Sequence, residues 1–166
     1  MWKQRGWVLF VCLGIVPGVS AQDLNTKAPN FTGQTTSGEV VQLSDYEGKV
    51  VLLDFWASWC GPCLKEMPFL IQLYQENPDA AFEIIAVNID TELERIEEFL
   101  ESLDAEVPFI ILTDQEATIP PLYDLEAMPT SLFIDANGMV RFKHAGFRES
   151  DEDQYRDELQ TLLDEG

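Results

Sequence analysis

Basic residues are scarce in this chain of 166 residues, which has 10 Lys and Arg against 30 Asp and Glu and a formal net charge of −20. Nucleic-acid phosphates are held mainly by Lys and Arg, so the composition excludes a nucleic-acid partner. The same acidity opposes adhesion to a surface of anionic lipids. The composition therefore argues against both kinds of partner.

Histidine occurs once and cysteine three times, and this limits metal and haem sites. A structural zinc site needs four ligands, whereas the single CxxC supplies two and His144 lies far along the chain on a predicted strand. Covalent haem attachment needs His directly after the second Cys, where this chain has Leu64. We predict no bound metal and no cofactor, with a copper site on the two thiolates as the alternative.

A long apolar run is also missing. The run from about Trp7 to Val16 is shorter than the roughly 20 residues of a transmembrane helix. Lys3 and Arg5 precede it and small residues follow it, which is the order of a secretory signal peptide. We predict a signal peptide over residues 1–21 and one domain over 22–166. If the segment stays uncleaved, it would anchor the chain to a membrane.

Cleavage would remove two basic residues, no acidic residue and Cys12, leaving 8 basic and 30 acidic residues with a net charge of −22. Cys60 and Cys63 would be the remaining cysteines. Export implies an oxidising compartment. We expect the bacterial periplasm, or the outer face of the inner membrane if the segment anchors the chain.

Strand and helix patterns alternate along the rest of the chain. The run over 50–56 is apolar almost throughout, which is typical of a strand buried on both faces. Ser150 stands where it could cap a last helix, whose inner apolar stripe includes Tyr155. This order predicts an α/β fold with a mixed central sheet flanked by helices. The other expected strands are 31–35, 40–43, 82–89, 109–112, 131–134 and 139–143, with a hairpin turn over 135–138 between the last two, and the other expected helices are 60–77 and 93–103.

Cys60 and Cys63 lie where the buried strand meets the start of a helix. Unpaired N–H groups and the positive end of the helix dipole stabilise a thiolate there. Cys60 is then the exposed nucleophile, and Cys63, one turn into the helix, is the buried resolving thiol. Pro62 suits the first helical turn, and Gly61 leaves room for a substrate backbone. This placement favours redox chemistry over an inert disulfide.

The stretch DFWASWCGPC resembles the active-site strand and loop of thioredoxins. CLKEMP, with Glu66 and Pro68, resembles the TlpA/ResA-type branch of exported thioredoxin-like proteins, and Met128-Pro129-Thr130 resembles the family's cis-proline loop. The resemblance covers about residues 28–165. It implies a thioredoxin-like fold with an N-terminal β extension and a helix–strand insertion within 91–127.

The resemblance also implies roles for individual residues. Cys60 would attack a substrate disulfide, Cys63 would close the intramolecular disulfide, and Asp54 would accept the proton of Cys63 with a pKa raised by desolvation. Thioredoxins pair this acid with a Lys on the neighbouring strand, where this chain has Ala86. A second acid near the site would be Asp90 or Glu92, although Asp90 could instead cap a helix.

Pro129 is expected to be cis and to place the backbone of Met128 beside Cys60 for pairing with a substrate strand. Trp59 should flank the sulfur, whereas Trp56 is expected in the core. The predicted substrate-binding residues are Trp59, Gly61, Pro62, Met128, Pro129 and Thr130.

The glycine–proline pair between the cysteines resembles reducing thioredoxins, which indicates a reductase. The resemblance implies electrons from a membrane thiol carrier and clients that contain disulfides, such as apocytochrome c. Two other functions stay open. One is a copper-delivery or metal-binding module, and the other is a peroxiredoxin-like peroxidase, although Ala57 stands where that pattern needs Thr.

Overall fold

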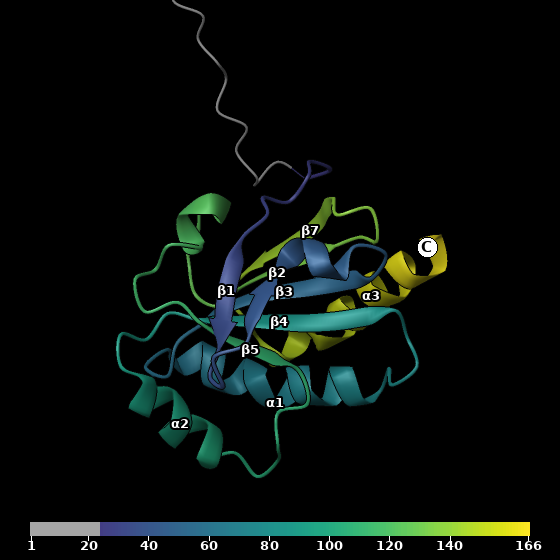
Figure 1. The fold of residues 1–166 in the computed structure, drawn as a ribbon. Coiled ribbons are helices and arrows are strands. Elements are labelled where there is room, and N and C mark those ends of the chain that lie inside the picture. Colours follow the sequence, from purple (N-terminus) through teal and green to yellow (C-terminus); the bar gives the residue numbers. More distant parts are fainter. Residues whose placement is uncertain (1–23) are drawn as a thin grey trace, which may run out of the picture.

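The computed structural model describes residues 24–166, so the predicted signal peptide lies outside the described residues. One mixed sheet forms the centre of the molecule (Figure 1). Its strand order is β2-β1-β5-β4-β3-β6-β7. The strands are β1 (Thr32–Thr35), β2 (Val40–Gln42), β3 (Val50–Trp56), β4 (Phe82–Asn88), β5 (Ile110–Thr113), β6 (Thr130–Ile134) and β7 (Val140–Ala145).

The three central strands β3, β4 and β5 are parallel, and the outer pairings are antiparallel. This confirms the mixed sheet. All seven residues of β3 are buried, as its continuous apolar run predicts, because both faces of the central strand are covered. The β6–β7 hairpin turns at Gly138, whose φ is +75°, so the turn signal over 135–138 is also confirmed.

The helices are α1 (Gly61–Gln75), α2 (Leu93–Glu101) and α3 (Glu152–Glu165). Buried side chains from all three helices pack with one face of the sheet in a single cluster. The second cluster, on the opposite face, holds residues of the N-terminal segment and of the short 3-10 turns Leu43–Tyr46 and Pro120–Tyr123. Among residues 24–166, no helix combines the length and apolar character needed to cross a membrane.

Side chains alternate between the two faces along each strand. Leu52 and Trp56 of β3 belong to the helix-side cluster, so Asp54 between them also points toward the helices. Phe133 places Ser131 of β6 on the same face. Asp54 and Ser131, on two neighbouring strands, thus form a polar pair on the face of the sheet that α1 and α3 cover.

The predicted cap of the last helix is wrong. Ser150 lies inside the 3-10 turn Glu149–Asp151, and its Oγ contacts Asp151 Oδ1 at 3.2 Å. The Asp151 carboxylate instead accepts a hydrogen bond from the Arg148 N–H at 3.0 Å. Asp151 is the better acceptor for this turn, and α3 begins only at Glu152.

Candidate active site

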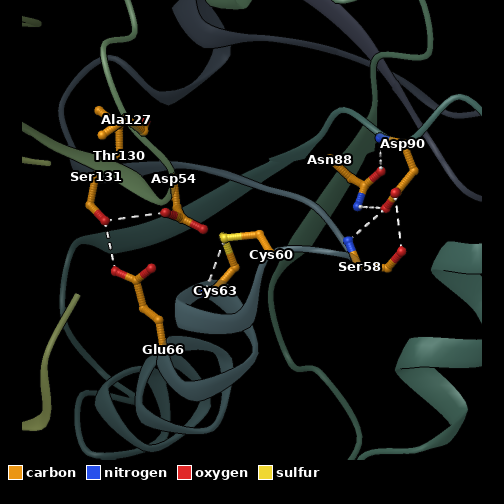
Figure 2. The surroundings of a disulfide bond; sticks show 10 residues. All are labelled: Asp54, Ser58, Cys60, Cys63, Glu66, Asn88, Asp90, Ala127, Thr130 and Ser131. Carbon is orange, nitrogen blue, oxygen red and sulfur yellow. Dashed lines mark hydrogen bonds between the residues drawn. A yellow bond between two sulfur atoms is a disulfide. The ribbon is translucent and has the colours of Figure 1, made fainter. Parts of the chain in front are cut away.

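Cys60 and Cys63 form a disulfide at the N-terminus of α1, with their Cα atoms 5.3 Å apart (Figure 2). The strand β3 ends at Trp56, and a short loop leads to Cys60, the N-cap residue of α1. The Cys60 Sγ accepts a hydrogen bond from the Cys63 N–H at 3.3 Å. The sulfur therefore already occupies the position in which helix N–H groups stabilise negative charge.

Access to the sulfur atoms is narrow. Cys60 is 6% exposed and Cys63 is 1% exposed, whereas Trp59 beside them is 63% exposed. Cys60 is the more accessible of the two cysteines, as predicted. The prediction that Cys60 is exposed is wrong for this disulfide form, because Cys60 packs within the core cluster. Gly61 borders open space, since a Cβ there would meet no atom within 4 Å. Approach of a partner backbone along Gly61 stays a prediction.

The Met128–Pro129 peptide bond is cis, as predicted. Met128 packs against the same cluster of buried residues that contains both cysteines. Thr130 is fully buried, and its Oγ1 donates to the Ala127 carbonyl at 2.7 Å. The Thr130 side chain thus holds the cis-proline loop, whereas contact of this loop with a substrate stays a prediction.

Asp54 is buried in β3, with 1% of its surface exposed. Burial raises its pKa well above the usual range, and the nearby Glu66 charge raises it further, while hydrogen bonds from Ser131 and the Phe55 N–H act in the opposite direction. Asp54 lies in register with Ala86 of β4, so the neighbouring strand offers no Lys at this position. The expected burial and the expected missing partner are both confirmed.

The second acid of the site is Glu66, to which sequence reasoning gave no role. Glu66 follows Cys63 by three residues on α1 and is 1% exposed. Burial raises its pKa to about 7, against hydrogen bonds from Ser131 and Tyr155 that lower it. Residues three apart share a helix face, so its spacing from Cys63 was the available signal.

Ser131 lies between the two acids. Its Oγ is 3.1 Å from Asp54 Oδ1 and 2.8 Å from Glu66 Oε1 (Figure 2). The Tyr155 hydroxyl, from α3, is 3.1 Å from both Ser131 Oγ and Glu66 Oε1. Strands β3 and β6 and helices α1 and α3 each contribute one polar group to a buried network beside the disulfide.

Asp90 has a different role from Asp54 and Glu66. Its carboxylate accepts hydrogen bonds from the Ser58 N–H at 2.8 Å, the Ser58 hydroxyl at 3.0 Å and the Asn88 amide at 2.8 Å. It therefore ties the loop before Cys60 to the end of β4, and the alternative of a helix cap is wrong. The N-cap of α2 is Glu92, whose side chain pairs at the surface with Arg95 at 2.9 Å.

Trp56 and His144 were also singled out from the sequence. Trp56 is fully buried, as expected of a core residue. His144, on β7, contacts Glu158 at 2.6 Å. Within residues 24–166, no group of three or more His, Cys, Asp or Glu side chains is arranged to hold a metal ion.

Comparison with known proteins gives matches over most of the chain. The model of the Redoxin family matches residues 23–159. Thiol-disulfide oxidoreductase ResA of Oceanobacillus iheyensis is 42% identical over 118 residues, and ResA of Bacillus subtilis is 35% identical over 113 residues. Each alignment covers 68% of this chain, but only 60% and 62% of the respective relative.

A solved structure from Chlorobium tepidum, given the provisional name thiol:disulfide interchange protein DsbE, superimposes with a TM-score of 0.80 and 39% identity. The alignment covers 85% of this chain and 98% of that protein. The two proteins thus share one fold over most of their length.

Proposed function

Since this chain belongs to the Redoxin family and is a thioredoxin-like protein of the TlpA/ResA type, we propose that it is a thiol-disulfide oxidoreductase that reduces client disulfides through Cys60 and Cys63. The observation that carries this proposal is the Cys60–Cys63 disulfide at the N-terminus of α1, beside two buried carboxyl groups. An inert structural disulfide has no need of either feature.

In the reducing direction, the cycle starts from the dithiol. The Cys60 thiolate, stabilised at the helix N-terminus, attacks one sulfur of the client disulfide, forms a mixed disulfide and releases the first client thiolate. Cys63 then loses its proton and attacks Cys60 Sγ, which releases the second client thiolate. Two electrons pass to the client, whose thiolates take up two protons, and the Cys60–Cys63 disulfide is formed.

Asp54 is the proposed acceptor of the Cys63 proton. A general base works best when its pKa lies near the working pH, and burial shifts the pKa of Asp54 upward, in that direction. Asp54 and the Cys63 side chain lie on the helix side of the sheet, in the region where α1 begins. Figure 2 shows Asp54 and Glu66 on one side of the disulfide and Asp90 on the other.

The reducing direction is favoured by Gly61 and Pro62, the pair between the cysteines in reducing thioredoxins. The pattern of residues 1–21 supports export, so an outside source of electrons is needed in an oxidising compartment. We therefore include a membrane thiol carrier as electron donor, with a location in the bacterial periplasm or on the outer face of the inner membrane. Apocytochrome c thiols are the proposed clients.

The proposal is tested with an oxidised peptide that carries the haem-attachment sequence CxxCH, with dithiothreitol as electron source. The wild-type chain should accelerate reduction of the peptide, and Cys60→Ser should abolish this effect. Cys63→Ser should accumulate a peptide joined to Cys60, which mass spectrometry detects. Undiminished catalysis by Cys60→Ser would overturn the proposal.

A further inference from the structure

We infer that the Ser131 hydroxyl links Asp54 and Glu66 into one shared proton store, and that Tyr155 is the positioning residue that holds this link in place. The inference deepens the proposed function and rests on it for the step at Cys63. It assigns roles to two residues, on β6 and α3, that lie outside the Cys60–Cys63 motif.

The inference follows from the number of hydrogens that are available to form hydrogen bonds between these four groups. Four short oxygen–oxygen contacts join the two carboxyl groups and the two hydroxyl groups, at 2.8–3.1 Å. Each hydroxyl carries one hydrogen, so Ser131 can donate to Asp54 or to Glu66 but not to both. A proton on one carboxyl group resolves this conflict, because that carboxyl then donates to Ser131, and Ser131 donates to the other.

Two arrangements of the same proton are therefore available. In one, Asp54 is protonated and donates to Ser131, which donates to the Glu66 carboxylate. In the other, Glu66 is protonated and donates to Ser131, which donates to the Asp54 carboxylate. Exchange between them needs only transfer of the Asp54 proton to Ser131 Oγ and of the Ser131 hydroxyl proton to Glu66, with no movement of heavy atoms.

The surroundings of the carboxyl pair, Asp54 and Glu66, favour sharing over two separate charges. Among residues 24–166, no Lys or Arg shifts the pKa of either group. The β4 residue opposite Asp54 is Ala86, and α1 contributes Cys63. From β7 and α3 the nearest titratable groups are His144, whose ring lies 4.3 Å from that of Tyr155, and its partner Glu158. Two uncompensated charges at this depth would be costly.

Glu66 can take over the proton from Asp54 through Ser131. Its second oxygen, Oε2, is buried and has no hydrogen-bond partner, so an ionised Glu66 would carry an unsatisfied charged oxygen. Moving the proton onward to Glu66 restores Asp54 as a base after it has taken the proton of Cys63.

Tyr155 is well suited to fix this geometry. Its ring is fully buried, and its hydroxyl reaches across from α3 to Glu66 and Ser131. Four rings contact it and prevent it from turning away: Phe69, Phe133, His144 and Phe147. The C-terminal helix thereby contributes to the site through a residue that lies 89 positions from Glu66 in the sequence.

The test follows the two carboxyl carbons by ¹³C NMR during a pH titration of the oxidised full-length chain, with Asp54→Asn and Glu66→Gln used to assign the signals. In the wild type, both carbons should respond in the same two steps, because a coupled pair titrates as one unit. Ser131→Ala should change how each carbon's response divides between the two steps, because it removes the hydroxyl that passes the proton but leaves the Glu66 charge that acts on Asp54. Tyr155→Phe should keep the shared steps but move the later one to higher pH, since it removes a hydrogen bond that lowers the pKa of Glu66.

Tyr123→Phe is the matched control. Tyr123 is as deeply buried as Tyr155 and also loses one hydroxyl hydrogen bond, to the Pro29 carbonyl, but it lies in the cluster on the opposite face of the sheet. Its titration should equal that of the wild type. Independent one-step titration of the two carbons in the wild type would overturn the inference, whether or not the chain reduces disulfides.

A kinetic experiment then joins the inference to the reaction. A chromogenic thiol in a mixed disulfide with Cys60 reports the rate at which Cys63 attacks. At neutral pH, Ser131→Ala should slow release of this thiol by about tenfold, which is less than the full contribution of a general base. An unchanged rate would show that Ser131 does not transfer a proton in the reaction and would overturn this role. If coupled titration is present but the wild type exchanges no disulfides, the proposed function fails and the proton store stands.

Discussion

Two groups of buried carboxylates lie on opposite sides of the same disulfide (Figure 2). Asp90 accepts three hydrogen bonds from Ser58 and Asn88, and we call this group the Asp90 clamp. Asp54 and Glu66 form the carboxyl pair, joined through one serine hydroxyl. All three acids are equally buried, at 1% exposure.

The Asp90 clamp and the carboxyl pair differ in the number of their hydrogen-bond donors. In the Asp90 clamp, a backbone N–H, a hydroxyl and an amide group all donate to one carboxyl group, so Asp90 can hold the loop in place. The carboxyl pair has fewer donors than acceptor oxygens and no cation, and burial raises the pKa of both its members. Burial alone therefore does not decide what an acid does, whereas its hydrogen-bond donors separate a structural carboxylate from a proton-transfer group.

The largest effect on stability should come from breaking the Asp90 clamp. Asp90→Ala leaves the Ser58 N–H and the Asn88 amide without their acceptor, so we expect the free energy of unfolding to fall by about 4 kcal/mol. Urea denaturation of the oxidised chain measures this. A loss below about 1 kcal/mol would show that the clamp is not what fixes the loop.

The carboxyl pair should behave in the opposite way. The pKa of Glu66 is raised from 4.5 to about 7, so the folded state holds a proton that the unfolded state has lost. Stability from this group is complete below about pH 4.5 and is lost as the pH rises toward 7. Glu66→Gln should remove this loss, which amounts to about 3 kcal/mol. Unfolding curves of both proteins at pH 5 and pH 8 should diverge toward the higher pH, and parallel curves would contradict the assignment.

Asp54→Asn sharpens the comparison through reactivity. The variant keeps the shape of the side chain but removes the proton acceptor, so resolution by Cys63 should slow by about a hundredfold at neutral pH. Stopped-flow measurement of mixed-disulfide decay gives this rate. The first attack by Cys60 should change much less, and equal slowing of both steps would indicate a distorted site instead.

The smallest effect concerns one donor of the Asp90 clamp. Ser58→Ala removes the hydroxyl hydrogen bond of 3.0 Å to Asp90 Oδ1 but keeps the backbone N–H bond of 2.8 Å. We expect a loss of about 1 kcal/mol, clearly below that of Asp90→Ala. Equal losses in the two variants would mean that the backbone bond contributes little.

Features with a local pattern could be predicted from the sequence. The apolar run of β3, the CxxC before α1 and the hairpin glycine each depend on neighbouring residues, and all three were found where expected. The position of Ala86 beside Asp54 followed from alignment and is confirmed by the strand register.

Contacts between distant segments could not be predicted in this way. Tyr155 was expected only as part of the inner stripe of the last helix, and nothing in its neighbourhood indicates that its hydroxyl meets Glu66. Asp90 was ambiguous because an acid after a strand and before a helix suits a cap as well as a loop clamp. The outcome depends on Ser58, 32 residues earlier, which lies beside it only in the folded chain.

The equilibrium potential of the Cys60–Cys63 couple tests the central claim most directly. It is measured by equilibrating the chain with dithiothreitol or glutathione mixtures and counting free thiols. The account predicts a value below about −230 mV, in the range of thioredoxins that reduce their clients. A value near −120 mV, typical of strong oxidants, would contradict the assignment of this chain as a reductase.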